Sequence, residues 1–503
     1  MTNQKSYSQI LKSSSMVGGS QLIRMMIGVV STKFAAILIG PSGVGLIGAY
    51  QSIIQLGIQL AGLGINQSGV RDVAVSSGSE DEEAVARTVS ILRRMCWLTG
   101  LVGAVVLAAL AVPVSQLTFG NSDHAVSLML LSMVVLVTTI AQGQMAVIQG
   151  LRRITDLVRV QILGSTAGAV ISIGLYASFG KAGIVPSLMA IALFNLGSAW
   201  WFSRKLFERS IPMSWRETFS GAKSLLGLGA AFMVGGLATT FTAYATRALI
   251  VRDIGMDGLG MYQAAFSISG YVLNFVLGAM GADFYPRLAG VSEDHEEMVC
   301  LVNEQTEIGL LLATPAIVAT LALAPLAINL LYSTQFAPAV DLLRWFAMGC
   351  FLRVISWPMA FIQLAKGEKY WFISSEIFFN VLHIFFIFVG LRFFGLCGAA
   401  IAFFSMYVLY VFGVRLIARH LICFSWDKAT KRLIISQLFI VGCVFVGSLV
   451  LPGLWSMAFG GILSFVVGAY SLRQLLARLG KEHRVYRMIV KIPFLGKMFN
   501  PYH

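Results

Sequence analysis

Four cationic side chains stand inside long apolar stretches of this sequence. Arg24 and Lys33 share one stretch, Arg247 lies in a second and Arg353 in a third. A charge at the centre of a lipid bilayer costs about 2.5–3.5 kcal/mol on insertion scales, so it usually faces a cavity or an ionic partner. The arginine guanidinium stays protonated when buried and can bind two phosphate oxygens at once. Arg24 and Arg353 lie deepest in their stretches, and for these two we predict a cavity that receives an anionic headgroup.

Other interpretations of these cations are open on the sequence alone. Lys33 and Arg247 could extend to the membrane interface, where a long side chain reaches water. A further cation, Arg344, could pair with Asp341 three residues earlier on one helix. Nine residues separate Arg24 from Lys33, which places the two on opposite faces of an ideal helix. Both line one cavity only if their helix bends or the cavity is wide.

Uncharged and titratable polar residues also recur at helical spacing. Gln51 and Gln55 are four residues apart, and Glu376 and His383 lie along one face of another apolar stretch. Polar residues at this spacing can line a hydrated cavity that holds a sugar, and they can equally join neighbouring helices by hydrogen bonds. Because Glu376 and His383 can both titrate, we predict a coupling or cavity role for this pair.

No motif of a known catalytic or metal site accompanies these residues. The sequence contains no HExxH pair, Walker loop, GxSxG elbow or spaced set of cysteines and histidines. The glycines from Gly40 to Gly45 precede an apolar helix but follow no strand, so they predict a tight turn between helices. We therefore expect a protein that is not an enzyme and that uses no cofactor or metal ion.

The composition places these residues in a membrane. Hydrophobic residues make up 57% of the 503 residues and charged residues 12%. A membrane-spanning helix needs about 20 apolar residues, and its backbone must satisfy its hydrogen bonds internally. The apolar runs are long and continuous, unlike the alternating segments of about 10 residues in a transmembrane barrel. We predict an all-α integral membrane protein with about fourteen transmembrane helices. The expected spans lie near residues 13–38, 43–70, 90–112, 125–149, 157–179, 184–203, 222–250, 258–283, 305–332, 338–364, 370–391, 395–418, 433–451 and 454–472.

The loops between the expected spans alternate in charge. Loops after even-numbered spans carry most of the basic residues, such as Arg71, Arg87, Arg93 and Arg94 after the second span. Cytoplasmic loops are enriched in Lys and Arg, so both termini are predicted to be cytoplasmic. The net charge of +14 then reflects cytoplasmic loops near anionic membrane lipids, and no nucleic-acid partner is expected.

Two halves of the chain carry short matching segments. Residues 16–19, 39–45 and 79–81 correspond in order to residues 233–236, 254–260 and 292–294. Six expected spans separate the two copies, so both have the same orientation, as in transporters built from parallel repeats. We predict two parallel six-helix bundles, followed by two extra helices and a basic interfacial tail. These parts cover residues 1–210, 211–420 and 421–503.

The segment at residues 39–51, IGPSGVGLIGAYQ, resembles the Wzx-type flippases of lipid-linked oligosaccharides. These flippases belong to the multidrug/oligosaccharidyl-lipid/polysaccharide (MOP) exporter superfamily, which also holds the multidrug exporters called MATE. Residues 335–345 and 365–366 are similar to the matching region of enterobacterial common antigen and O-antigen flippases. The resemblance extends from the first expected span to about the twelfth.

The resemblance implies MATE-like bundles around a central cavity that opens alternately to each side of a bacterial inner membrane. The substrate would be an undecaprenyl-diphosphate-linked oligosaccharide for surface polysaccharide, such as the O-antigen of lipopolysaccharide. Relatives often hold the diphosphate with basic cavity residues, and Arg24, Lys33, Arg247 and Arg353 are the nearest candidates here. A polysaccharide polymerase and its chain-length machinery would be partners.

Two other functions stay open on the sequence. A cation-coupled multidrug exporter of the same superfamily would have an acidic rather than a basic cavity. A membrane polysaccharide polymerase or glycosyltransferase generally needs a substantial outer loop. The longest expected outer loop here, at residues 113–124, has about a dozen residues, which argues against that enzyme class.

Overall fold

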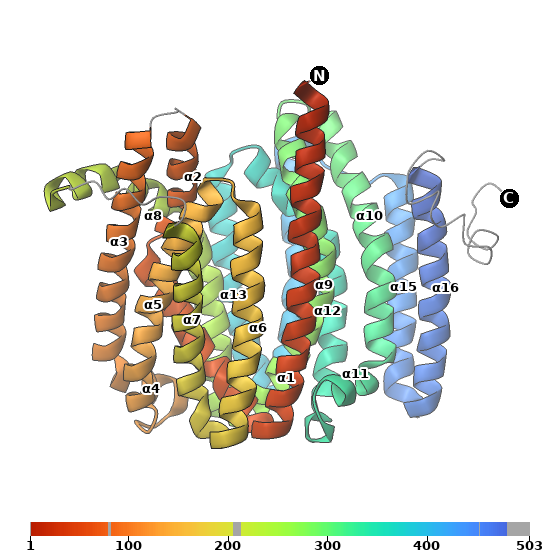
Figure 1. Ribbon diagram of the computed structural model, residues 1–503. Helices are drawn as coiled ribbons and strands as arrows, with labels where there is room; N and C mark the ends of the chain where they lie inside the picture. Colours follow the sequence, from red (N-terminus) through yellow and green to blue (C-terminus); the bar gives the residue numbers. More distant parts are fainter. Residues whose placement is uncertain (1, 79–81, 205–212, 452, 480–503) are drawn as a thin grey trace. The chain divides into compact units, whose positions relative to one another are not determined.

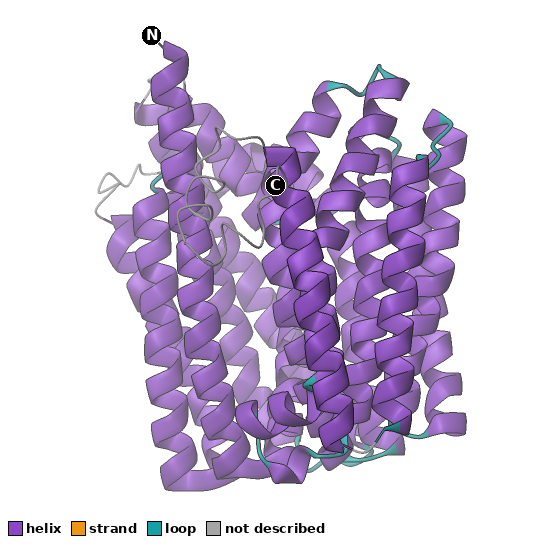
Figure 2. Ribbon diagram, turned by 90° about the vertical axis from the view of Figure 1, so that its right-hand side faces the viewer, coloured by secondary structure: helices purple, strands orange, loops and turns teal. Residues whose placement is uncertain are grey.

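The computed structural model describes residues 2–78, 82–204, 213–451 and 453–479. Helices joined by short loops make up these residues (Figures 1 and 2). The helices are α1 (Thr2–Gly62), α2 (Ile65–Gly78), α3 (Glu82–Ala109), α4 (Ala111–Phe119), α5 (Ala125–Gly150), α6 (Ile154–Phe179), η1 (Gly180–Gly183), α7 (Ile184–Arg204), α8 (Trp215–Asp253), α9 (Met256–Gly290), α10 (His295–Ala322), α11 (Ala324–Leu331), η2 (Thr334–Phe336), α12 (Ala339–Ala365), α13 (Lys369–Phe394), α14 (Cys397–Ile422), α15 (Lys428–Val450) and α16 (Gly453–Leu479).

Ten segments of the described chain are long and apolar enough to cross a membrane. Two of them, Gly18–Gly62 and Ile154–Arg204, have 45 and 51 residues. A helix rises about 1.5 Å per residue and needs about 20 residues to cross, so each of these two has room for two crossings. The prediction of an all-α, multi-pass membrane protein is confirmed, and the total of fourteen helices stays a prediction.

Gly40 divides α1 into two helices. Its backbone has φ 66° and ψ −172°, a conformation that glycine adopts without the clash of a Cβ atom. Pro41 follows and lacks the N–H of a regular helical hydrogen bond. The turn predicted from these glycines is therefore present. The matching Gly255, which lies between α8 and α9, also has a positive φ, of 99°.

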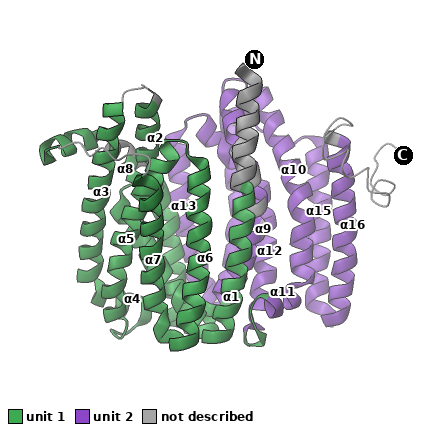
Figure 3. Cartoon of the chain, in the orientation of Figure 1, with its two compact units in different colours: residues 1–261, 331–335 green, residues 262–330, 336–503 purple. Residues whose placement is uncertain are grey.

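The chain forms two compact units, coloured separately in Figure 3. Unit 1 comprises residues 1–261 and 331–335, and unit 2 comprises residues 262–330 and 336–503. Unit 1 thus contains α1 to α8, and the division falls inside α9. The boundaries at residues 210 and 420, which were drawn from the sequence repeat, stay a prediction.

In unit 1, α5 packs against α1, α2, α3 and α7, and α8 packs against α1, α2 and α3. The core beside the second half of α1 is built from Tyr50, Ile53, Leu128, Leu131 and Val135. Each of these side chains is at most 3% exposed. Burying one such large apolar side chain contributes about 1.5–3 kcal/mol, so this core fixes α1 firmly against α5.

In unit 2, α12 packs against α10 and α14, and α13 packs against α14. The last two helices, α15 and α16, pack against α10. Polar contacts secure this junction: Thr430 Oγ1 donates to Glu307 Oε1 at 3.1 Å, and Asn303 Nδ2 donates to the Ser425 carbonyl at 3.2 Å. The predicted interfacial tail beyond residue 479 lies outside the described residues, as does the segment at residues 79–81.

Candidate functional site

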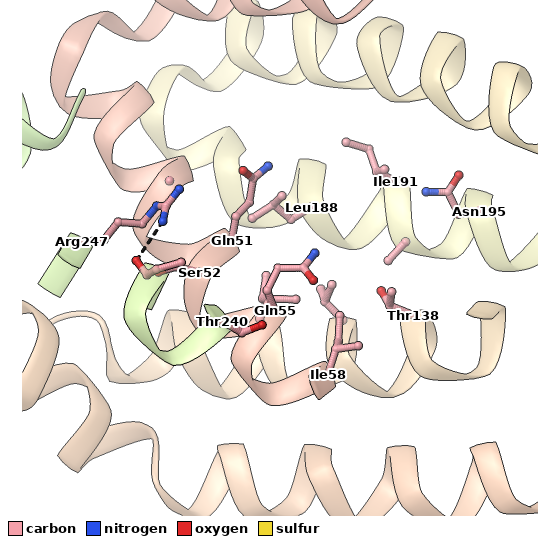
Figure 4. A pocket seen from close by; sticks show the side chains of 15 residues that line it. Gln51, Ser52, Gln55, Ile58, Thr138, Leu188, Ile191, Asn195, Thr240 and Arg247 are labelled. Carbon is pink, nitrogen blue, oxygen red and sulfur yellow. Dashed lines mark hydrogen bonds between the residues drawn. The ribbon is translucent and has the colours of Figure 1, made fainter. Parts of the chain in front are cut away.

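A cavity of about 450 Å³ lies within unit 1, between α1, α5, α7 and α8. Its volume is in the range of about 300–1,000 Å³ that is usual for small-molecule sites. Figure 4 shows the side chains around it. Its polar lining consists of Gln51, Ser52, Gln55, Thr138, Asn195, Thr240 and Arg247.

Helical spacing explains why these side chains meet. The second half of α1 presents Gln51, Gln55 and Ile58, which stand four and then three residues apart. Residues with that spacing share one helix face. In the same way α8 presents Thr240 and Arg247. The polar faces of α1 and α8 therefore converge on one space. Thr138 of α5, Asn195 of α7 and apolar residues of these two helices complete its lining.

Arg247 supplies the positive charge of this cavity. Its Nη1 donates to the carbonyl oxygen of Ala243 at 2.8 Å, within α8. In Figure 4 its guanidinium lies beside Gln51 and Ser52. No carboxylate is among the described residues that line the cavity. The cavity is therefore suited to an anionic group and to hydroxyls that exchange hydrogen bonds with amides.

Two predicted cations of α1 lie elsewhere in unit 1. Arg24 Nη1 donates to Oε1 of Gln161 on α6 at 3.0 Å. Lys33 Nζ donates to the carbonyl oxygen of Tyr332. Neither is among the described residues that line the cavity. Their separation agrees with the nine-residue spacing, which places them on different faces of the helix.

The fourth predicted cation, Arg353, lies in unit 2 among polar residues of α12, α13 and α14. Its guanidinium carbon is 5.9 Å from the ring centroid of Tyr407, and its charge acts on the carboxylate of Glu376. Asn380 Nδ2 donates to the Glu376 carbonyl at 2.8 Å and to its Oε2 at 3.4 Å. We call Arg353, Glu376, Asn380 and Tyr407 the unit-2 cluster. His383 lies beside it, with its ring 6.0 Å from that of Phe403.

Sequence reasoning missed three cavity residues, Ser52, Thr138 and Asn195. Asn195 is a single amide inside an otherwise apolar stretch of α7, a signal that could have been read. Thr138 and Ser52 gave no signal, because hydroxyls in membrane helices usually bond to their own backbone, as Ser52 Oγ does to the Ala49 carbonyl at 2.7 Å.

A membrane protein of many helices, with a polar cavity between the helices of one unit, has the architecture of a transporter. Solved structures of other proteins share this fold. An inward-facing MATE family transporter of the MOP superfamily matches with a TM-score of 0.66 and 16% identity, over 79% of this chain and 95% of that one. The Lipid II flippase MurJ in an inward closed conformation matches with a TM-score of 0.66 and 11% identity, over 93% and 100%.

The model of a family described as "Polysaccharide biosynthesis protein" matches residues 35–341, and the chain belongs to this family. Two curated relatives are the Lipid III flippases of Escherichia coli (strain K12) and Shigella flexneri. Each is 26% identical over 410 residues, which are 80% of this chain and 96% of the relative. The resemblance to Wzx-type flippases of the MOP superfamily is thereby confirmed.

Proposed function

We propose that this protein is a flippase that moves an undecaprenyl-diphosphate-linked oligosaccharide across the bacterial inner membrane. The similarity to Lipid III flippases along 80% of the chain is the observation that carries this proposal. The unit-1 cavity supports it, because one cation and several amides and hydroxyls fit a diphosphate joined to a sugar.

In this mechanism, the Arg247 guanidinium binds the diphosphate, and Gln51 and Gln55 exchange hydrogen bonds with sugar hydroxyls. Arg24, whose described hydrogen-bond partner is a neutral amide, and Lys33 contact the headgroup at other stages of transport. Arg353 likewise contacts the anionic headgroup, in unit 2. The polyprenyl tail stays in lipid throughout, where its burial costs nothing.

The finer architecture is part of the proposal. Fourteen helices form two parallel six-helix repeats at residues 1–210 and 211–420, and two further helices follow within 421–503. The positive φ angles of Gly40 and Gly255, which match in the repeat, support this arrangement. Both termini are cytoplasmic, and the bundles expose the site to each leaflet in turn.

The transported molecule is not altered chemically, so the protein is not an enzyme. The names of the relatives as flippases support this view. The unit-2 cluster and His383 are the proposed place where an ion couples to transport. A polysaccharide polymerase and its chain-length machinery receive the translocated oligosaccharide. A multidrug exporter for organic cations is disfavoured because the described cavity lining has a cation and no carboxylate.

The test is translocation of a lipid-linked oligosaccharide in proteoliposomes, followed by a membrane-impermeant reagent that reacts only with outward-facing sugar. We expect wild-type protein to increase the reactive fraction and Arg247→Ala to lower the rate roughly tenfold or more, as loss of a charge-assisted contact predicts. Arg159→Ala is the control, because Arg159 is exposed and pairs with Asp156 at 3.2 Å. Transport by Arg247→Ala at the wild-type rate would contradict the role of Arg247, and a chemically changed substrate would indicate an enzyme.

A further inference from the structure

A second hollow of unit 1, with a volume of about 510 Å³, lies between α3, α5 and α7. We call it the α3–α5–α7 groove. Trp97 and Arg93 contribute from α3, Gln144 from α5, and Leu193, Gly197 and Trp200 from α7. It shares no lining residue with the cavity around Arg247. The groove is therefore a separate feature that the proposed transport path does not use.

Arg93 is held in place at one side of this groove by two neutral partners. Its Nε donates to Gln144 Oε1 at 3.1 Å, and its Nη2 donates to Ser203 Oγ at 2.8 Å. Ser203 Oγ in turn donates to the same Gln144 oxygen at 2.8 Å. Gln144 and Ser203 are buried, with 5% and 0% exposure, so this triangle fixes the direction of the guanidinium.

The triangle leaves the Arg93 charge without a neutralising carboxylate among the described residues. A guanidinium has five N–H donors, and the described partners of Arg93 accept from two of its nitrogens. Arg93 lies inside α3, eleven residues after the helix begins at Glu82. A fixed, half-buried cation in a helix that is long and apolar enough to span a membrane is a candidate site for an anion.

The rest of the groove is apolar and open. Trp97 is 55% exposed and Trp200 50% exposed, although both are large aromatic side chains. A Cβ atom added to Gly197 would meet no other atom within 4 Å, so none of the described residues fills the space over it. At the rim, the Arg204 guanidinium carbon lies 4.7 Å from the Trp200 ring centroid and adds a second positive charge.

A ligand that matches this groove has an anionic head and an apolar chain. We propose that the α3–α5–α7 groove binds an anionic phospholipid of the surrounding membrane, with its phosphate on Arg93 and an acyl chain along Leu193 and Gly197. Basic pockets between membrane helices bind acidic headgroups in this way, and tryptophan is enriched at the level of the headgroups. Charge complementarity and the apolar walls together favour a phospholipid over a free anion.

The test is lipid retention by the full-length protein. Wild-type protein is purified from nanodiscs that contain equal amounts of phosphatidylglycerol and phosphatidylcholine, and bound lipid is counted by native mass spectrometry. We expect selective retention of phosphatidylglycerol. Arg93→Gln should lower its retention roughly tenfold, whereas Arg93→Lys, which keeps the charge, should retain more than Arg93→Gln.

A second variant tests the apolar part of the groove. Gly197→Leu should fill the groove and reduce retention while leaving Arg93 in place. Gly174→Leu on α6 is its matched control, since Gly174 is also exposed with no atom within 4 Å of an added Cβ. Arg159→Gln is the charge control. Both controls should retain phosphatidylglycerol as the wild type does.

Several outcomes would overturn the proposal. One is that the wild type retains phosphatidylglycerol and phosphatidylcholine equally. Another is that Arg93→Gln and Gly197→Leu both retain as much phosphatidylglycerol as the wild type does. Displacement of phosphatidylglycerol by undecaprenyl phosphate at a lower concentration would show that the groove belongs to the transport substrate instead. Because retention is measured without transport, failure here is distinguishable from failure of the proposed flippase function.

Discussion

Gly45 of α1 and Gly260 of α9 lie where the backbones of these two helices approach closely, although 215 positions separate the glycines in the chain. A Cβ atom on Gly45 would lie 2.9 Å from the Gly260 nitrogen and 2.2 Å from the Met256 carbonyl oxygen. A Cβ atom on Gly260 would lie 1.9 Å from the Pro41 carbonyl oxygen. The two glycines end the matching segments 39–45 and 254–260, so these two segments meet at equivalent positions.

Alanine at either glycine should therefore destabilise unit 1. The obstructing atoms belong to the backbone, which cannot rotate away, so overpacking should cost about 1–3 kcal/mol. We expect a lower midpoint of thermal unfolding in detergent for Gly45→Ala and for Gly260→Ala. Gly174→Ala provides the control, because it has open space around it and should gain or lose little. Unchanged unfolding midpoints in both variants would contradict this close approach.

Local patterns in the sequence predicted local structure well. The pairing of Arg344 with Asp341 needs only helical spacing, and the two side chains are indeed 2.9 Å apart. The turn at Gly40 likewise follows from the preferences of one glycine and one proline. In both cases the determining atoms are a few residues apart, so no knowledge of the packing was needed.

The composition of the cavity was less predictable, because it depends on which helices pack together. Gln51 and Gln55 were singled out by their spacing, and Arg247 by its charge in an apolar stretch. Their meeting with Asn195 requires that α7 and α8 both pack beside the second half of α1, which periodicity does not encode. For the same reason, the four cations singled out in the sequence are distributed over different partners.

Replacing Arg247 by lysine separates charge from geometry in the cavity. Lysine keeps the positive charge, but it is a point charge that cannot bind two oxygens of a phosphate in one plane. We expect Arg247→Lys to transport more slowly than the wild type and faster than Arg247→Ala. The comparison of initial translocation rates in proteoliposomes measures this order. Equal rates for the lysine and alanine variants would mean that the charge of Arg247 does not contribute.

The unit-2 cluster should behave as a coupled pair. Arg353 and Glu376 interact electrostatically within the membrane segments, so removing one leaves the other charge uncompensated. We expect Arg353→Ala and Glu376→Ala each to slow transport, and the double variant to lose less than the sum of the two effects. A coupling energy of about 0.5–3 kcal/mol is typical of residues that share one network. Strictly additive losses in a double-mutant cycle of translocation rates would show that the two residues act independently.

His124 should make unit 1 sensitive to acid. It precedes α5, its Nδ1 lies 2.9 Å from the Tyr50 hydroxyl, and its ring packs 4.0 Å from that of Phe119. Burial lowers the pKa of His124 from its ordinary value, and the nearby Asp123 carboxylate opposes this effect in part. The folded protein therefore binds a proton here less readily than the unfolded chain does.

Between the lowered pKa of the folded state and the unfolded value near 6.5, the unfolded state binds more protons, so the free energy of unfolding falls as the pH falls. We expect the thermal unfolding midpoint of the wild type to drop more between pH 7.5 and pH 5.5 than that of His124→Asn, which cannot take up this proton. Tyr50→Phe keeps the histidine and should keep most of the pH dependence, because burial is the main cause of the shift. If His124→Asn and the wild type lose the same stability over this range, the pH dependence arises from other groups.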